Sequence, residues 1–189
     1  MKPIRSLLLS AGLGTRLRPL TLSTPKCLVE INNKPIIEYW IDKLEKIGTQ
    51  KVLVNTHYLS KKVESFLKKQ KKRKLDIQIS YEKELLGTAG TLISNADFFN
   101  DSIGILIHAD NFTKFELNEL IEKHLSRPKK CLLTMLTFKT FNPESCGIVQ
   151  VDSENILQSF HEKQVEPPGN IANAAVYVFE DDFLYWLNQ

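Results

Sequence analysis

Short apolar runs alternate with amphipathic stretches through the first 110 residues of the chain. Residues 4–9 form a leucine-rich run with the length of a strand that is buried on both faces. From Pro35 to Ile47 the apolar residues recur at helical spacing, and Gly48 is placed to end that helix. Ser60 is expected to cap a second helix. The same reasoning predicts further strands at 51–55, 75–81 and 104–107.

Strands and helices that alternate in this order form right-handed βαβ units around a parallel sheet. We therefore predict an α/β fold, a three-layer αβα sandwich with a Rossmann-like, mostly parallel central sheet. In open sheets of this kind the ligand lies beyond the carboxyl ends of the strands. The rest of the chain is expected to add a helix at 116–125, a strand at 131–139, a hairpin-like connection through 152–155, and a last helix capped by Asp181 or Asp182.

The composition limits the class of protein. A length of 189 residues, 42% hydrophobic and 25% charged, is typical of one globular domain with its own core. No apolar run approaches the length of a membrane span, and no signal-peptide pattern opens the chain, so no membrane partner is expected. Three cysteines without metal-type spacing indicate a reduced, cytoplasmic setting. The net charge is a mild +3, and the basic run at 68–74 lacks aromatic residues for base stacking, so we interpret it as the solvated end of a helix and expect no nucleic acid.

A basic, glycine-containing loop follows the first apolar run directly. Gly12 and Gly14 allow positive φ angles and let a ligand approach the backbone, whose consecutive N–H groups can point at one anion. Thr15, Arg16 and Arg18 add a hydroxyl group and two cations, and arginine matches phosphate oxygens well. These features predict a polyphosphate site at the carboxyl end of the first strand.

Other interpretations of this loop were compared with the sequence. A dinucleotide-binding fingerprint needs a third glycine or alanine where Leu17 stands, and then a helix that Pro19 disfavours. A Walker-type loop needs a Gly-Lys-Ser/Thr ending, which is absent. An ordinary tight turn with surface arginines accounts for the two glycines, but not for Pro25-Lys26 and the Lys34 to Glu38 segment that follow.

Two later strand ends carry further polar residues. After the strand at 75–81, Gly87 and Gly90 permit close backbone approach at a helix start, although small residues there also suit plain packing. Asp110 follows the strand at 104–107, where an unpaired buried carboxylate would be costly. Mg²⁺ would relieve that cost, because it favours one or two carboxylates together with phosphate oxygens. No catalytic role is expected for the neighbouring His108.

A long motif connects these features. It runs Gly12-x-Gly14-Thr15-Arg16-Leu17-x-Pro19-Leu20-Thr21, followed by Pro25-Lys26 and Lys34-Pro35-Ile36-Ile37-Glu38. On this motif the chain closely resembles the sugar-nucleotide pyrophosphorylases, nucleotidyltransferases that act on sugar 1-phosphates. Within that family it is most similar to the mannose-1-phosphate guanylyltransferases, through Leu86-Gly87-Thr88-Ala89-Gly90. The resemblance covers most of the chain and implies a fold of the nucleotide-diphospho-sugar transferase type.

The resemblance also implies residue roles. The nucleotide is expected to contact Ala11, Gly12, Gly14, Thr15, Arg16, Glu82, Gly87 and Thr88, the last three at the base. The sugar is expected to contact Gly147, Glu162 and Asn173, close to Ala175, where relatives usually have glycine. The chemistry is expected to depend on Arg16, Lys26, Asp110 and Lys163, with Mg²⁺ held by Asp110.

The activity implied is the joining of a sugar 1-phosphate to a nucleoside triphosphate, with mannose 1-phosphate and GTP giving GDP-mannose and pyrophosphate. One alternative is another sugar-nucleotide pyrophosphorylase, acting on heptose or glucose 1-phosphate with GTP, CTP, dTTP or UTP. A second alternative is a non-catalytic nucleotide-binding homologue. Whether the protein forms a homo-oligomer is left open.

We expect a single nucleotidyltransferase domain over residues 1–189, with a nucleotide-binding half at 1–111 and a sugar-binding half at 112–189. Relatives supply a second metal-binding aspartate from a later strand, which this chain does not reach. The sugar-binding half is therefore expected to be incomplete. A natural short form, a truncated chain and a piece of a longer polypeptide all fit this expectation.

Overall fold

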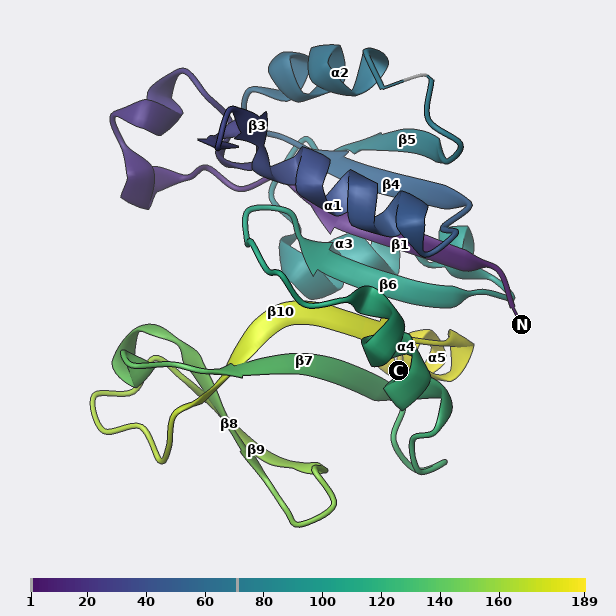
Figure 1. Ribbon diagram of the computed structural model, residues 1–189, viewed down its shortest axis with the longest axis vertical. Helices are drawn as coiled ribbons and strands as arrows, with labels where there is room; N and C mark the ends of the chain where they lie inside the picture. Colours follow the sequence, from purple (N-terminus) through teal and green to yellow (C-terminus); the bar gives the residue numbers. More distant parts are fainter. Residues whose placement is uncertain (1, 71) are drawn as a thin grey trace.

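The computed structural model describes residues 2–70 and 72–189. Its main sheet has eight strands, of which seven follow the order β5-β4-β1-β6-β10-β8-β9, and β7 pairs with β10 (Figure 1). The strands are β1 (Ile4–Leu9), β4 (Lys51–Thr56), β5 (Asp76–Tyr81), β6 (Ile103–His108), β7 (Leu133–Lys139), β8 (Gly147–Val151), β9 (Leu157–Glu162) and β10 (Ile171–Phe179), and a separate small sheet pairs β2 (Glu30–Ile31) with β3 (Lys34–Pro35).

The four strands from the first half of the chain run parallel. β1 lies between β4 and β6, so that Leu7 pairs with Leu53 on one side and with Leu106 on the other. All three leucine side chains are buried, which explains why these strands are nearly continuous apolar runs. β5 pairs in parallel with β4 at the edge. The predicted parallel sheet is confirmed for this half.

Helices cover both faces of the sheet (Figure 1). Adjacent residues of β1 point to opposite faces, and they belong to different hydrophobic clusters. Leu8 packs in a cluster with Trp40 and Ile121, whereas Leu7 packs with Leu92 and Leu184. The predicted three-layer αβα sandwich is thereby confirmed. One face carries α1 (Ile36–Lys46), α2 (Ser60–Lys68) and α4 (Leu117–Leu125), and the other carries α3 (Gly87–Ser94) and α5 (Asp181–Leu187).

The second half of the chain adds antiparallel strands to the same sheet. β10 runs antiparallel to β6, β7 and β8, and the β8–β9 hairpin continues the sheet away from its parallel part (Figure 1). The register of β10 shifts between Asn173 and Tyr177, which marks a β-bulge. Bulges bend a strand and re-aim its side chains. The bulge in β10 therefore lies where the sheet passes from its parallel to its antiparallel part.

Two predicted helix caps are wrong. Ser60 is the first residue of α2, and the cap position belongs to Leu59, whose φ of 50° is left-handed and which makes no side-chain capping bond. Glu180 is the cap residue of α5. Asp181 and Asp182 lie in the first turn instead, where a negative charge still suits the helix dipole. In both cases the helix begins one residue away from the position that the capping preference suggested.

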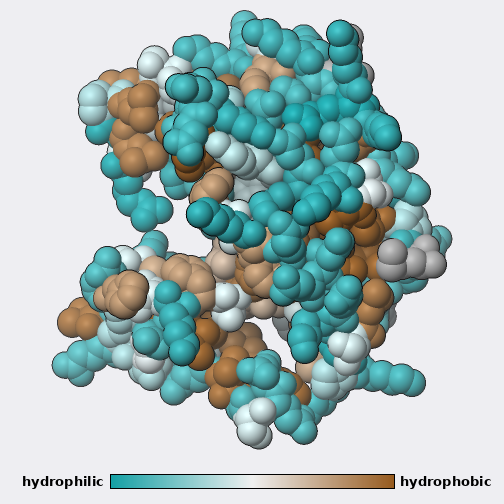
Figure 2. All heavy atoms as spheres, viewed as in Figure 1, coloured by the Kyte–Doolittle hydropathy of each residue, from teal (hydrophilic) through white to brown (hydrophobic). Residues whose placement is uncertain are grey.

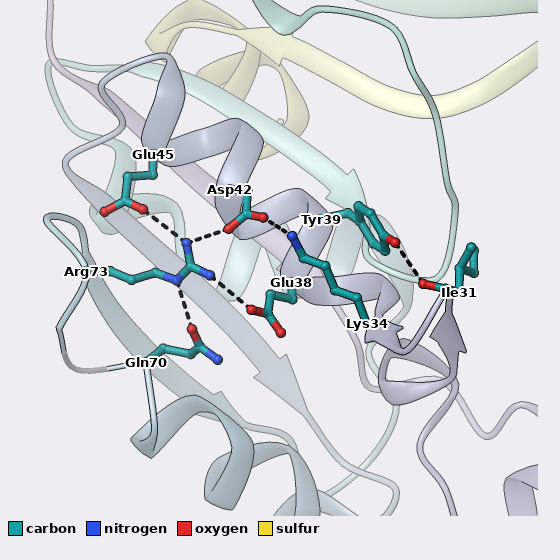
Figure 3. A network of polar contacts seen from close by, with 8 residues as sticks. All are labelled: Ile31, Lys34, Glu38, Tyr39, Asp42, Glu45, Gln70 and Arg73. Atoms are coloured by element: carbon teal, nitrogen blue, oxygen red, sulfur yellow. Dashed lines mark hydrogen bonds and ion pairs between the residues drawn. The ribbon is translucent and has the colours of Figure 1, made fainter.

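Arg73 ties the segment before β5 to α1 (Figure 3). Its guanidinium contacts Asp42 at 2.5 Å, Glu45 at 3.0 Å and Glu38 at 3.4 Å, and its side chain is only 16% exposed. Burial alone would raise the pKa of Asp42, but hydrogen bonds from Lys34 and Arg73 outweigh burial and lower this pKa. Arg73, within the basic run at 68–74, thus has a structural role.

The remainder of that basic run is less informative. Lys68 lies in the last turn of α2 and Lys69 is its C-cap, which suits the dipole of the helix, whereas residue 71 lies outside the described residues. Among the described residues no helix is long and apolar enough to cross a membrane.

Candidate functional site

The carboxyl ends of β1, β4, β5 and β6 border a cavity of about 260 Å³. This is the edge at which an open α/β sheet receives its ligand. We call it the first cavity. Its wall includes most of the residues predicted to bind the nucleotide, namely Ala11, Gly12, Glu82, Gly87 and Thr88, and the predicted catalytic residues Lys26 and Asp110. It also includes residues to which no site role was assigned: Ser10, Cys27, Asn55, Thr91 and His108.

The turn that follows β1, residues 10–15, is called the phosphate turn after its predicted ligand, and Gly14 is the residue in it that requires glycine. Its φ is +64°, and a Cβ atom there would lie 2.9 Å from Cγ2 of Thr21. The Thr21 hydroxyl also donates to the Gly14 carbonyl at 2.7 Å, which fixes the turn. Of the two glycines in this turn that allow a positive φ, Gly14 adopts one and Gly12 does not. Gly12 instead faces open space at the cavity wall, where a ligand can approach its backbone.

Lys26 and Asp110 meet in the first cavity although 84 positions separate them in the sequence. The Lys26 ammonium donates to Oδ2 of Asp110, and the two side chains are 25% and 27% exposed. This contact offsets the cost of a partly buried carboxylate. Cys27 beside them is buried, and burial raises the pKa of its thiol to about 12. The thiol is therefore protonated at neutral pH and unsuited to act as a nucleophile.

Glu82 is a buried carboxylate at the other end of the first cavity, with 5% of its surface exposed. Its Oε1 accepts hydrogen bonds from Nδ2 of Asn55 at 2.9 Å and from the hydroxyl of Thr91 at 2.5 Å. Its Oε2 accepts only a long bond of 3.4 Å from the N–H of Leu86. All three donors are neutral. Glu82 therefore keeps acceptor capacity for an N–H group of a ligand.

His108 lies between the two ends of the first cavity. Its Nε2 is 3.3 Å from the hydroxyl of Thr88, at the start of α3. Burial lowers the pKa of His108, while Asp110 raises it and Lys26 lowers it further. The ring is therefore neutral at pH 7, with one donor and one acceptor nitrogen.

A second, larger cavity of about 780 Å³ lies between the residue after the phosphate turn, the segment after β6 and the antiparallel strands. Figure 2 shows the molecule hollowed on this side. Arg16 lines this second cavity and not the first, although it was predicted to hold the nucleotide phosphates. The residues predicted for the sugar, Gly147, Glu162 and Asn173, all line it, as does Lys163, which was predicted to be catalytic.

Gly147 owes its identity to a close approach in the β8–β9 hairpin. A Cβ atom at this position would lie 2.5 Å from Cζ of Phe160 and 2.9 Å from Oε2 of Glu162. Glu162 and Lys163 form an ion pair of 3.3 Å, and their side chains are 59% and 55% exposed. Both charged groups are therefore free to exchange this weak contact for a ligand.

Asn173 holds the β-bulge of β10 together. Its Nδ2 donates to the hydroxyl of Tyr177 at 2.6 Å, and its Oδ1 accepts from the backbone N–H of Ala175 at 2.8 Å. Ala175 has a left-handed φ of 54°, which costs an L-residue about 1–2 kcal/mol. One amide hydrogen of Asn173 and one lone pair of its Oδ1 remain for a sugar hydroxyl.

The structure thus divides the predicted site residues into two groups. Lys26, Glu82 and Asp110 share the first cavity with Ala11, Gly12, Gly87 and Thr88, whereas Arg16 and Lys163 share the second with Gly147, Glu162 and Asn173. Gly14 and Thr15 line neither cavity.

Sequence reasoning missed Asn55 and Thr91. The signal for Asn55 was present, because it is a polar residue at the end of an apolar strand, as Asp110 is. Thr91 gave no such signal, since it lies inside the short helix α3.

Fold and site together define an α/β protein with a ligand cavity at the carboxyl ends of parallel strands. Residues 5–188 match the family model described as nucleotidyl transferase, so the chain belongs to this family. It is 35% identical over 189 residues to the mannose-1-phosphate guanylyltransferase catalytic subunit beta of Drosophila melanogaster, covering 95% of this chain and 49% of that protein. The corresponding protein of Dictyostelium discoideum is 37% identical over 185 residues, at 96% and 51% coverage. The chain thus spans about half the length of these relatives.

Solved structures agree on the fold. A putative glucose-1-phosphate thymidylyltransferase from Bacillus anthracis, in complex with sucrose, matches with a TM-score of 0.89 at 21% identity, covering 98% of this chain and 75% of that one. HddC from Yersinia pseudotuberculosis, complexed with GMP-PN, matches with a TM-score of 0.79 at 23% identity, covering 97% and 79%. At these identities the likeness concerns the fold. The predicted nucleotide-diphospho-sugar transferase type of fold is confirmed.

Proposed function

We propose that the protein transfers a nucleotidyl group from a nucleoside triphosphate to a sugar 1-phosphate. The observation that supports this most directly is the pair of cavities on either side of the segment after β6, since Asp110 lines the first and its chain neighbour Asn111 lines the second. The first holds Lys26 and Asp110 beside the turn that follows β1, and the second holds Arg16 and Lys163 beside exposed polar groups. A triphosphate in the first cavity and a sugar phosphate in the second would bring the two reacting phosphates together at their border.

Guanine is the base that the first cavity suits best. Glu82 offers a carboxylate oxygen with free lone pairs, and it is held by neutral donors only. Guanine presents two adjacent N–H donors on one edge, the N1–H and the 2-amino group, which match a carboxylate. The bases of ATP, CTP and UTP do not offer this pair. Mannose 1-phosphate is the proposed sugar substrate, because the two relatives described above are named as mannose-1-phosphate guanylyltransferases.

The reaction requires positioning rather than a strong base. An oxygen of the sugar 1-phosphate attacks the α-phosphorus of the triphosphate. The bond between the α-phosphorus and the oxygen that bridges it to the β-phosphate breaks, and pyrophosphate leaves with that oxygen. The attacking oxygen is already anionic, so no proton has to be removed. In this scheme Lys26 neutralises charge at the α-phosphate, while Arg16 and Lys163 orient the sugar phosphate. Departing pyrophosphate would contact the backbone of Ala11 and Gly12.

Asp110 is the residue that would hold Mg²⁺. No group of three metal-ligating side chains occurs among the described residues, so a magnesium ion there would depend on phosphate oxygens for its other ligands. This dependence fits a metal ion that arrives together with the nucleotide. The ion would neutralise charge on the phosphates. The contact between Lys26 and Asp110 would then have to open, which frees the Lys26 ammonium for the α-phosphate. We also propose a cytoplasmic location, supported by the three cysteines, which are all free thiols.

The experiment is a substrate matrix. The protein is incubated with Mg²⁺, each of GTP, ATP, CTP, dTTP and UTP, and mannose, glucose or heptose 1-phosphate, while pyrophosphate release is measured. GTP with mannose 1-phosphate is expected to give the fastest release. A faster reaction with another pair would change the substrates but keep the reaction. Nucleotide binding without pyrophosphate release from any pair would contradict an enzyme and favour a binding protein.

A further inference from the structure

One buried amide joins the two ends of the first cavity. Asn55 lies near the end of β4 and is 2% exposed. Its Oδ1 accepts the backbone N–H of Ser10 at 2.7 Å, and its Nδ2 donates to Oε1 of Glu82 at 2.9 Å. The same side chain therefore touches the first residue of the phosphate turn and the carboxylate at the proposed base end.

The surrounding bonds leave little freedom in this arrangement. The Ser10 hydroxyl donates to the backbone carbonyl of Asn55 at 2.5 Å, and the Thr91 hydroxyl donates to the same Oε1 of Glu82. An amide is the side chain that offers an acceptor to Ser10 and a donor to Glu82 at once. Oε1 is thereby occupied from two sides, and Oε2 is the oxygen of Glu82 left to a ligand.

We propose that Asn55 is a positioning residue: its amide donor aims Glu82 Oε2 at the nucleobase and so sets base selectivity, while its amide oxygen separately fixes the start of the phosphate turn. The proposal rests on the proposed function, because it takes Glu82 as the group that contacts the base.

The test compares two nucleotides that differ in one donor group. ITP lacks the 2-amino group of GTP, so a well-aimed Glu82 is expected to favour GTP by roughly 10- to 100-fold in calorimetric Kd, the value of one hydrogen bond to a charged group. Asn55→Asp keeps the acceptor for Ser10 but replaces the neutral donor to Glu82 with a second carboxyl group, which either repels the Glu82 carboxylate or shares a proton with it, and both outcomes disturb the charge and aim of Glu82. We expect the GTP-to-ITP preference of this variant to fall to within about threefold. A general loosening of the fold would weaken the binding of GTP and ITP alike and leave the ratio of their Kd values unchanged.

Two matched variants separate the two hydrogen bonds of the Asn55 amide, the one with Ser10 and the one with Glu82. Inorganic triphosphate, used as a competitor, should bind Asn55→Asp about as well as the parent, whereas Asn55→Ala should bind it several-fold more weakly because Ser10 loses its acceptor. The double variant Asn55→Asp with Glu82→Gln reverses the direction of the hydrogen bond. It should recover most of the melting temperature lost in Asn55→Asp, which keeps the test usable if the single variant folds poorly.

Three results would overturn the inference. They are equal binding of GTP and ITP by the parent, an unchanged ratio in Asn55→Asp, and no recovery in the double variant. A parent protein that binds neither nucleotide would instead overturn the proposed function, and the inference with it.

Discussion

The two cavities are built on different principles. The first is backed by parallel strands, and two of its polar side chains, Asn55 at 2% and Glu82 at 5% exposure, are buried and hydrogen-bonded to each other. The second rests on an antiparallel hairpin, where the Glu162 and Lys163 side chains are more than half exposed. Buried polar networks fix geometry before a ligand arrives, whereas exposed ion pairs contribute little by themselves. The first cavity, proposed for the nucleotide, is therefore preorganised, and the second, proposed for the sugar phosphate, depends more on its ligand.

The largest expected effect tests the preorganised cavity. Asp110→Asn removes the carboxylate proposed to hold Mg²⁺, and turnover should fall on the order of 10³-fold, because charge on the phosphates is no longer compensated. Pyrophosphate release is the measurement. Asp76→Asn at the exposed start of β5 serves as the control and should keep parent turnover. Full activity of Asp110→Asn would remove this residue from the mechanism.

Substitution of Arg16 tests which phosphate this residue binds: that of the sugar, as its position in the second cavity suggests, or those of the nucleotide, as the sequence predicted. Arg16→Gln should lower turnover by roughly 10²–10³-fold in either case. Because Arg16 lines the second cavity, we expect the KM of the sugar 1-phosphate to rise while that of the triphosphate changes little. Arg18→Gln is the matched control, since Arg18 lines neither cavity. A rise in the triphosphate KM alone would favour the original prediction that Arg16 holds the nucleotide phosphates.

Low pH should destabilise the protein through His124, which lies where α4 packs on β7. His124 is fully buried, and burial, with the nearby Arg127, lowers its pKa to about 4. The unfolded chain, with a pKa near 6.5, binds the proton more readily, so stability is present above pH 6.5 and is lost as pH falls towards 4. The loss should reach about 3 kcal/mol. Denaturant midpoints at several pH values measure it. His124→Gln should show a flatter pH dependence, and an unchanged one would contradict this account.

Arg73 tests a network remote from both cavities. Arg73→Met leaves Asp42, Glu45 and Glu38 without their shared cation, and the free energy of unfolding should drop by about 2 kcal/mol, because the guanidinium is largely buried. Chemical denaturation measures this change. Lys46→Met, which breaks the more exposed pair with Glu116, should lower the free energy of unfolding much less than Arg73→Met does. Equal losses in the two variants would show that burial does not distinguish them.

The smallest effect concerns the bulge of β10. Ala175→Gly relieves the left-handed φ of 54° and should stabilise the protein by less than about 1 kcal/mol, because greater freedom of the unfolded glycine offsets part of the gain. Thermal unfolding measures the shift. Ala174→Gly, whose φ is not positive, should destabilise the protein instead. Destabilisation by both substitutions would rule out strain at Ala175.

The sequence predicted the parallel half well and the antiparallel half less well, for physical reasons. Residues 7–9 and 52–54 are continuous apolar runs at the centre of their strands, because both faces of these strands are covered by helices. Helix starts at Ser60 and Asp181 were misplaced by one residue, since capping preferences do not fix the terminal residue. Arg16 was predicted to hold the nucleotide phosphates but lines the second cavity, and the sequence did not indicate this because a turn fixes the backbone and not the direction of an arginine side chain.

The central claim is that the first cavity receives a nucleoside triphosphate with its base at Glu82 and its phosphates at Lys26 and Asp110. The most direct measurement is a crystal structure of the protein with Mg²⁺ and a non-hydrolysable GTP analogue. The account predicts guanine against Glu82 and Thr88, the phosphates beside Ala11 and Gly12, and a metal ion on Asp110. A nucleotide bound elsewhere, or bound here with its phosphates at Glu82, would contradict it.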